Sequence, residues 1–591
     1  MKRDYNLDKL KDYENDGAEE ENKQDEESII RDFCEEFKFY ADARRPKEDR
    51  WKRWLDLYYS QSAKRPTGTA NIFVPATFTI VETLVPHLAN AYINNKKPVE
   101  LYGRSPEDHQ FAEQNKQILE YQLNQQLFIL EYVLTLRQAI QLGTAIAFTS
   151  QRFDEDYDMP YHEMVDLFDF WPDPYARDID DCRSVFTRKM VSLEELKAKG
   201  YKTQGLENDL ILSGLNNTEN IQTSGINIEN QNPYGPDGQS SEDNLSKNKY
   251  KKDVELLIRW TDKDYTIVAN QKFLMKQAEN PFLHKKKPFT RYVLIPQSNS
   301  FYGIGLIEPI ESLQNELNTK RNQRLDEVNL SIHQMWMVKP DALKDTNQLK
   351  MRPGGIIEVD ADRPMSDVIQ PVPVNNFTGN ALQEEGICKS DIQNTSGIDD
   401  NIQGKYDVGK QVTATEFRAK MGQATNRIDF YFKLMAQTGL KRQITLHIQL
   451  NNQFIQTPQV IRIIGNEGVK WPVIMPQEIS NNFDIEIDVD PSGYNKESQL
   501  NKYMGALQVI MQFAQFAMAQ GIQVNPEPVI RKILEKFDIE EEIVNKALPQ
   551  PQSSPCSPYA PTENPFEQSG GFSDFPPELM NIMEQEGGNI Q

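Results

Sequence analysis

The chain has 591 residues, of which 38% are hydrophobic, and its formal net charge is −23. A sequence of this length exceeds one ordinary hydrophobic core, so we expect several packed regions, and the low apolar content suits an elongated subunit that completes its burial against neighbours. The acidity argues against a protein that grips nucleic acid statically, because such proteins are basic; it fits either plain solubility or a surface that must not hold DNA tightly.

The cysteine pattern and the apolar segments exclude further classes of protein. Cys34, Cys182, Cys388 and Cys556 lie far apart without CxxC spacing, which excludes a disulfide scaffold and a zinc ribbon. The most apolar stretch, residues 506–522, is interrupted by glutamines and falls short of the roughly 20 residues of a membrane span. Because the N-terminus also lacks the apolar core of a signal peptide, we expect a soluble, intracellular chain with no membrane partner.

The first predicted elements are an acidic tail and two helical regions. Residues 1–27 are acidic and poor in apolar side chains, so we expect them to be disordered. A helical pattern then runs over residues 28–60. Ser105, which precedes a proline, is a predicted N-cap, and leucines at helical spacing after it predict one long helix that continues to about Leu142. The leucines of that stripe are Leu119, Leu123, Leu127, Leu130 and Leu134.

Strand-like alternation replaces the helical pattern after this helix. Residues 145–200 predict strands and turns around an aromatic, proline-rich corner at residues 168–174. Residues 203–253 are rich in Asn, Gly, Ser and Gln and have little periodicity, which predicts a long exposed insertion. Residues 254–258 and 292–295 read as strands of one small sheet that flanks this insertion.

A second long helix is predicted after the FYGIG segment at residues 301–305. Its apolar stripe begins at Leu306, pauses at a polar gap and resumes between Leu325 and Met335. Charged side chains in and around the gap could pair between parallel helices or face DNA, and their position within an apolar stripe favours the inter-helix interpretation. These residues are Lys320, Arg321, Arg324, Glu316, Asp326 and Glu327.

Short strands, a loop and a third long helix complete the predicted elements. Thr413 and Glu416 form a capping box that begins the third helix. The other expected elements are strands at 335–338, 356–359, 368–374, 460–464 and 483–489, helices at 379–394 and 496–548, a glycine-bearing loop at 396–410, and a disordered tail after residue 549.

Catalytic patterns are weak throughout the chain. Residues 404–411 have the glycine and lysine spacing of a phosphate-binding loop, but Gln411 stands where Ser or Thr must reach magnesium, and no apolar strand precedes the loop. The histidines are scattered singly, and no nucleophile elbow or catalytic carboxylate pair stands out. We therefore predict no enzyme, no catalytic, cofactor-binding or metal site, and no cofactor. Lysine clusters at 247–252 and 285–287 are interpreted as solvated loops.

The order of elements resembles the portal, or head-to-tail connector, proteins of tailed bacteriophages. The resemblance is sharpest over residues 301–338, FYGIGLIEPIESLQNELNTKRNQRLDEVNLSIHQMWMV, where a Tyr-Gly-x-Gly-like start leads into a helix rich in Leu, Gln, Asn and Arg. TSGID at 395–399, TATEF at 413–417 and ARDIDDCRSVF at 176–186 are further landmarks. The similarity covers about residues 30–545.

The resemblance implies a mainly α fold with small β elements (α+β), arranged as the wing, stem, clip and crown of a ring-forming subunit. The tails at 1–27 and 549–591 would be disordered. The implied regions are a wing at 28–300 with the insertion 203–253, a first stem helix at 301–334, a clip at 335–374, a second stem helix at 375–394, a tunnel loop at 395–412, a long helix and strands returning to the wing at 413–495, and crown helices at 496–548.

It also implies a function and a set of partners. Such a ring, usually of twelve subunits, would assemble in the host cytoplasm, occupy one capsid vertex of the virion, and conduct double-stranded DNA non-specifically during packaging and ejection. Its partners would be the terminase large subunit, head-completion and tail adaptor proteins, and the major capsid and scaffolding proteins. Lys405 and Lys410 of the tunnel loop would touch the DNA backbone, and the charged residues of the second long helix would make inter-subunit stem contacts.

Two alternatives to a portal stay open at this point. One is another virion structural protein, such as an internal core or tail-tube component. The other is an ATPase built on residues 404–411, for which nucleotide binding lost in Lys410→Ala would be the sign.

Overall fold

The computed structural model describes most of the first 500 residues. The described residues are 22–61, 65–93, 99–153, 159–201, 203, 205–206, 253–332, 335–338, 369–372, 378–398, 400, 402 and 427–460, and shorter stretches at 463–465, 468–470, 473–476, 479, 483–487, 505 and 508–509. The chain comprises two units, Met1–Gln499 and Leu500–Gln591, and every element below belongs to the first. The predicted elements at 356–359 and 413–416, nearly all of the insertion at 203–253 and nearly all of the helical region at 496–548 lie outside the described residues.

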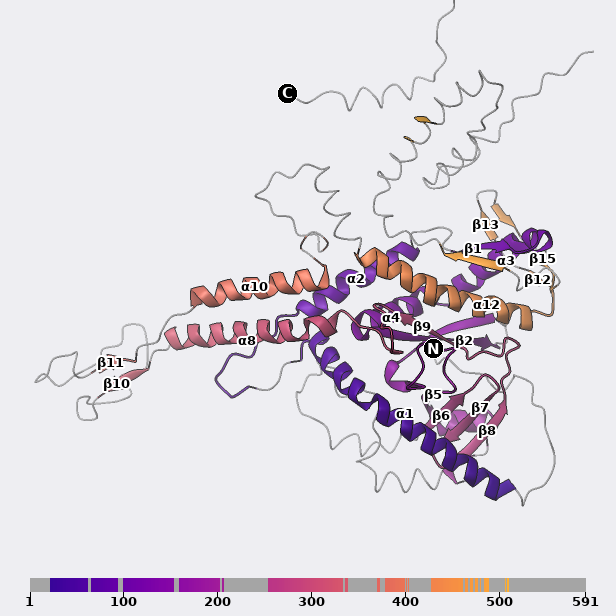
Figure 1. The fold of residues 1–591 in the computed structure, drawn as a ribbon, viewed down its shortest axis with the longest axis horizontal. Coiled ribbons are helices and arrows are strands. Elements are labelled where there is room, and N and C mark those ends of the chain that lie inside the picture. The colour runs from indigo at the N-terminus through magenta and orange to yellow at the C-terminus, as the bar shows by residue number, and fades with distance from the viewer. Residues whose placement is uncertain are drawn as a thin grey trace, which may run out of the picture. The chain divides into compact units, whose positions relative to one another are not determined.

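The described part is a mixed α/β fold (Figure 1). The small β elements are confirmed, but the expectation of a mainly α chain understates the strands. The helices are α1 (Asn22–Tyr58), α2 (Ala76–Ile93), α3 (Pro106–Gln125), α4 (Phe128–Leu142), α5 (Leu193–Ala198), α8 (Ile307–Ile332), α10 (Thr378–Ser396) and α12 (Lys441–Phe454), with a 3-10 turn η2 (Leu167–Asp169) and a π-helical turn η5 (Ala436–Leu440). The strands are β1 (Val99–Gly103), β2 (Thr144–Arg152), β3 (Met159–Val165), β4 (Phe170–Pro172), β5 (Val185–Ser192), β6 (Asp253–Trp260), β7 (Asp264–Ala269), β8 (Phe273–Glu279), β9 (Phe289–Val293), β10 (Trp336–Val338), β11 (Ile369–Pro371), β12 (Gln459–Val460), β13 (Ile463–Gly465), β14 (Gly468–Lys470), β15 (Val473–Ile474) and β16 (Phe483–Ile487).

Two antiparallel sheets organise the region between α4 and α8. One has the order β4-β5-β6-β7-β8 and the other β3-β2-β9. β6 and β9 therefore lie in different sheets, so the prediction of one small sheet at 254–258 and 292–295 is wrong. The physical reason is β2, which is buried on both faces over nearly its whole length and takes β3 and β9 as neighbours on its two edges.

The long helix predicted over residues 105–142 is two helices. Its start is confirmed, since the Ser105 hydroxyl accepts a hydrogen bond from the Asp108 amide at 3.2 Å. The backbone turns extended at Gln126, and α4 then points Phe128 into the core beside Tyr132. The leucine stripe fails beyond that break, because Leu127 is 64% exposed and Leu130 is 48% exposed.

The long helix α1 begins at Asn22, so residues 22–27 are helical and the predicted disorder of 1–27 is wrong for them.

The buried Arg44 of α1 holds the aromatic corner at residues 168–174 in place. The guanidinium donates to the carbonyls of Leu167 (2.9 Å), Phe168 (2.8 Å) and Phe170 and lies 4.0 Å over the Trp171 ring. A buried cation needs such acceptors, and here it fixes α1 against the corner.

The FYGIG segment starts α8 at a point of close backbone contact. Gly143 ends α4 with φ of 84°, and a Cβ added there would lie 2.4 Å from the Gly303 carbonyl oxygen. The Leu306 amide donates to the Ile140 carbonyl at 2.9 Å, and the Gly303 amide donates to the Thr144 hydroxyl at 2.8 Å. Glycine is required here because both backbones meet without room for side chains.

The third long helix is described from residue 427 onward and passes through η5 into α12. Gly439 within η5 packs on the fully buried Tyr292, where an added Cβ would lie 2.5 Å from the ring. The Tyr292 hydroxyl also donates to the Gln443 side chain. The wider π turn lets the helix pass this ring without losing its axis. The strands predicted near 460–464 and 483–489 are present as β12, β13 and β16, and β16 pairs with β1.

Candidate functional site

The helices α8 and α10 lie side by side and run in opposite directions (Figure 1). The predicted second helix at 379–394 is thus present as α10. At their far end, β10 follows α8 and β11 leads into α10, and the two strands pair with Met337 opposite Gln370. The residues between β10 and β11, with most of the clip predicted at 335–374, lie outside the described residues.

A buried carboxylate joins the two helices. The Glu385 side chain on α10 is only 3% exposed and pairs with Arg321 at 3.0 Å, Arg324 at 3.2 Å and Lys389 at 3.0 Å. Burial alone would raise the pKa of Glu385, but hydrogen bonds from Lys389 and Arg321 outweigh it and hold the pKa below its usual value. Lys320 pairs with Glu384 at 3.4 Å. Three predicted stem cations therefore bind α10 of their own chain.

The three predicted stem acids have other surroundings. Asp326 accepts hydrogen bonds from Arg65 at 3.2 Å and from the Ala70 amide. Glu316 hydrogen-bonds the Cys388 thiol, whose pKa is raised chiefly by burial and also by this carboxylate. Glu327 is half-buried on α8. Whether any of the six charged residues also meets a neighbouring subunit stays a prediction.

A ladder of amide and carboxylate side chains on α8 was missed from the sequence. Gln314, Asn318, Asn322 and Asp326 recur every four residues, and each accepts a backbone N–H from the segment 70–77. Four helical residues rise about 6 Å and two extended residues about 6.6 Å, so successive rungs meet every second residue of the extended part of that segment. The bonds join Thr77 N to Gln314 (3.2 Å), Val74 N to Asn318 (2.9 Å), Ile72 N to Asn322 (2.7 Å) and Ala70 N to Asp326.

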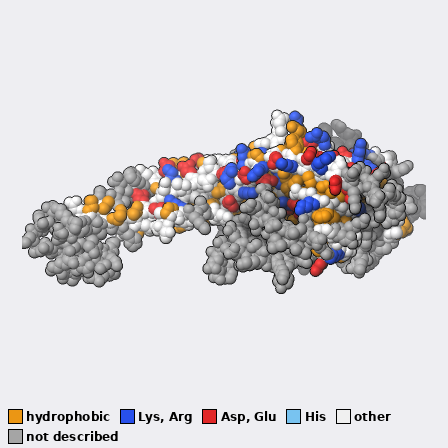
Figure 2. Space-filling model, turned by 90° about the horizontal axis from the view of Figure 1, so that it is seen from below, with side chains coloured by type: hydrophobic (Ala, Val, Ile, Leu, Met, Phe, Trp, Pro, Cys, Tyr) orange, Lys and Arg blue, Asp and Glu red, His pale blue; other side chains and the backbone are white. Residues whose placement is uncertain are grey.

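The outer faces of the two helices carry uncovered apolar side chains. Leu306, Ile310 and Leu317 are buried as predicted, but the second half of the α8 stripe is not. On α10, Leu382 and Ile387 are each 58% exposed. Figure 2 shows hydrophobic side chains gathered towards the far end of this helix pair. Contiguous exposed apolar surface of this kind is typical of a protein interface. The exposed residues near that end are Leu330, Ile332, Met335 and Met337.

The start of the predicted tunnel loop lies against the first described residue of the third helix. Arg427, at the start of the described part of the third helix, donates to the Thr395 carbonyl at 2.6 Å, and its guanidinium covers Gly397, which has φ of 75°. The TSGID segment is therefore the place where the chain leaves α10 and returns. Residues 403–426 lie outside the described residues, and with them Lys405, Lys410 and the loop at 404–411.

Two histidines that the sequence shows as isolated form a buried pair. His162 Nε2 and His447 Nδ1 are 2.9 Å apart, with Thr149 bonded to one ring at 3.0 Å and Gln122 to the other at 2.7 Å. Burial lowers both pKa values, that of His447 to about 3, so both rings are neutral at ordinary pH. Nothing in the spacing of the two histidines signals this contact. Among the described residues, no three His, Cys, Asp or Glu side chains are grouped as metal ligands.

Comparison with known families decides the identity of the chain. The model of the phage SU10 portal protein family matches residues 143–565, which is well over half of the sequence. The chain belongs to the SU10 phage portal protein family. The match begins at the glycine that closes α4 and includes the FYGIG segment, α8 and α10. No curated protein matches the sequence at a significant level.

Membership confirms the resemblance to phage portals and answers the two open alternatives. Portal proteins are structural and not enzymes, so the ATPase interpretation of residues 404–411 is set aside. A portal is also a different virion component from an internal core or tail-tube protein. The family implies a ring-shaped oligomer with phage-assembly partners. No helix among the described residues has the length and apolar character to span a membrane.

Proposed function

We propose that this portal chain forms the ring at one capsid vertex through which double-stranded DNA enters during packaging and leaves during ejection. The observation that carries the proposal is the antiparallel pair α8–α10. Its inner face is closed by buried ion pairs at Glu385, while its outer faces expose Leu382, Ile387 and the far end of α8. A closed ring of identical subunits covers such faces through a heterologous interface.

The regions of the chain take their roles from this arrangement. Residues 28–300 form the wing, α8 and α10 the two stem helices, and β10–β11 the base of a clip over 335–374. Residues 395–412 form a tunnel loop, whose first residue Thr395 accepts a hydrogen bond from Arg427. Residues 413–495 return to the wing, and 496–548 form the crown.

The net charge of −23 supports a conduit and not a clamp. Each fixed cation on a DNA path releases counterions and adds affinity, whereas an acidic wall lets the duplex slide. Lys405 and Lys410 are the exceptions within the tunnel loop, where they touch the DNA backbone transiently. The clip docks the terminase large subunit and later the head-completion and tail adaptors, and the wing meets capsid and scaffolding proteins.

The oligomeric state of the purified protein tests this proposal. Twelve copies of a 68.2 kDa chain weigh about 820 kDa. We expect electron microscopy and mass photometry to show rings of that mass with a central hole. Leu382→Glu together with Ile387→Glu is expected to abolish the rings, because charges at an apolar interface stay desolvated and unpaired.

The matched control is Leu127→Glu, since Leu127 is also exposed but lies between α3 and α4, outside the α8–α10 pair. This variant should form rings like the wild type. A wild-type chain that stays monomeric or dimeric even when co-expressed with its capsid and scaffolding proteins would contradict the proposal.

A further inference from the structure

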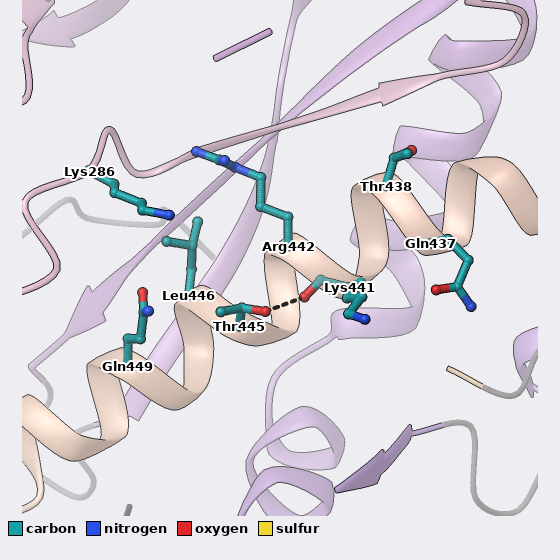
Figure 3. Close-up of a pocket in the computed structure, with 8 residues that line it drawn as sticks. All are labelled: Lys286, Gln437, Thr438, Lys441, Arg442, Thr445, Leu446 and Gln449. Atoms are coloured by element: carbon teal, nitrogen blue, oxygen red, sulfur yellow. Dashed lines mark hydrogen bonds between the residues drawn. The ribbon is translucent and has the colours of Figure 1, made fainter. Parts of the chain in front are cut away.

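A hollow of about 270 Å³ lies where the loop at residues 280–287 meets η5 and the start of α12. Figure 3 shows Lys286 reaching from that loop towards the helix, with Arg442 and Gln449 on the side that faces it. The lining is cationic and polar around the buried Leu446. It consists of Lys286, Gln437, Thr438, Lys441, Arg442, Thr445, Leu446 and Gln449.

The loop that carries Lys286 is held in place. Gln453 of α12 accepts from the Leu283 amide at 2.9 Å and donates to the Pro281 carbonyl at 2.7 Å. The Lys286 amide donates to His284 Nδ1 at 2.9 Å, and the His284 ring stacks on Phe282. A cation on a clamped loop loses little conformational freedom when it pairs with a ligand. The lysine run at 285–287 is therefore more than the solvated loop that its sequence suggested.

The cations of the hollow differ in how far they are engaged. Arg442 is fully engaged, because it grips both oxygens of Asp180 at 2.6 and 2.8 Å and donates to the Phe289 carbonyl. Lys287, the next residue on the loop, does not line the hollow; it is buried and paired with Asp262 at 2.7 Å. Lys286 is half-exposed, and its Nζ lies 4.0 Å from the carboxylate of Asp180, which Arg442 already neutralises. Lys441 is exposed and forms no ion pair within the described part of the chain.

The electrostatic field beside the hollow is positive. The pKa of His284 is lowered to about 4, first by burial and then by Lys286 and Arg442, against the opposing effect of Asp180. Lys286 and Lys441, which both line the hollow, supply the ammonium donors that suit a carboxylate side chain.

We propose that the basic hollow binds the acidic N-terminal stretch, residues 14–27, of a neighbouring copy of the chain. That stretch has eight acidic residues and one lysine. Its last two acids, Glu26 and Glu27, are exposed on α1. The inference rests on the ring of the proposed function, in which every hollow has a neighbouring copy of the chain.

Within its own chain, the start of α1 packs at a different site from the hollow. There α1 packs beside β8, where the Cys34 thiol donates to the Gln271 carbonyl, and Figure 1 places this end of α1 away from α12. A neighbouring copy is therefore the source of acidic residues that ring assembly brings to the hollow.

A charge swap tests the pairing in assembled rings. Lys286→Glu with Lys441→Glu should raise the protein concentration needed for half-assembly roughly tenfold in mass photometry. Adding Glu26→Lys and Glu27→Lys to the same chain should restore assembly. Lys38→Glu with Lys52→Glu makes the same change in charge at two exposed positions of α1 and should have no effect. Circular dichroism checks that the variants fold.

A labelled peptide of residues 14–27 tests the hollow without requiring rings. We expect fluorescence anisotropy to show salt-sensitive binding to the full chain that is lost in the Lys286→Glu, Lys441→Glu variant. Equal binding by this variant, or a charge swap that fails to restore assembly, would overturn the inference while the ring stands. Binding of a short DNA duplex that the variant loses, with no binding of the peptide, would overturn it too. Absence of wild-type rings would instead count against the proposed function.

Discussion

At the scale of single residues, the buried pair His162–His447 shows how a contact without sequence signal shapes the chain. The rings join β3 to α12, and Gln122 and Thr149 extend the hydrogen bonds to α3 and β2. Asn451 and Gln126 complete the polar surroundings, and none of these partners carries a charge. A neutral network of this kind is stable only while both imidazoles stay unprotonated.

Stability should therefore fall as the pH falls below about 6.5, the ordinary pKa of histidine. The folded-state pKa of His447 is about 3 and that of His162 is also well below its usual value, so the unfolded chain binds more protons throughout this window. For His447 the loss amounts to about 1.4 kcal/mol per pH unit, or about 2 kcal/mol at pH 5, and His162 contributes a loss of the same sign. Above pH 6.5 neither group contributes a slope.

The measurement is the midpoint of thermal unfolding between pH 7 and pH 4.5, for the wild type and for His447→Gln. Glutamine keeps a donor and an acceptor but does not titrate, so the variant should lose less stability on acidification even if it is less stable at pH 7. Identical pH slopes for the two proteins would show that the pair is not responsible.

At the scale of elements, the sequence predicted what local chemistry determines. Ser105 is an N-cap, the FYGIG segment begins a long helix, and the apolar stripe from Leu306 to Leu317 is buried. Predictions failed where distant partners decide. Leu127 is exposed although it continues the leucine stripe, because Phe128 and Tyr132 occupy the core at this point. Strand β9 lies in the sheet of β2 and not in that of β6, because β2 is buried and pairs on both edges. The charged gap in α8 was predicted to pair between parallel helices of neighbouring subunits, which stays a prediction; its cations pair instead with Glu384 and Glu385 on the antiparallel α10 of the same chain, a partner that spacing could not reveal.

The ladder on α8 yields a prediction at this scale. Asn322→Leu removes the acceptor of the Ile72 amide at 2.7 Å and the donor to the Ile72 carbonyl at 2.9 Å. Each backbone group left without a partner costs about 1–3 kcal/mol where water cannot replace it. We expect the amides of residues 70–77 to exchange hydrogen at least tenfold faster, measured by hydrogen–deuterium exchange with mass spectrometry.

Gln323→Leu is the matched control, because Gln323 is the next residue on the same helix and is exposed. It should leave exchange at 70–77 unchanged. Equal protection in the wild type and Asn322→Leu would mean that the segment is held by its apolar contacts and not by the ladder.

At the scale of the whole molecule, burial and charge are divided between two tasks. The region around α4, β2 and α12 closes its own apolar core, and a buried histidine pair joins β3 to α12 within it. The α8–α10 pair closes only its inner face and leaves apolar side chains outside. Under the proposed function, neighbouring copies in the ring would cover these apolar side chains, and copies of an acidic chain of net charge −23 would form a channel that does not hold DNA tightly.

In the proposed twelvefold ring, Lys405 and Lys410 of the tunnel loop would each occur twelve times, so that even transient contacts with phosphates would together hold the duplex. Lys405→Ala with Lys410→Ala is expected to reduce the DNA retained in filled heads and to make the remaining retention less dependent on salt. Filled heads are purified, incubated at rising salt concentrations and assayed for nuclease-resistant DNA. Lys38→Ala with Lys52→Ala removes the same charge from α1 and should retain DNA normally. Retention by the loop variant equal to that of this control would show that the two lysines do not touch the DNA.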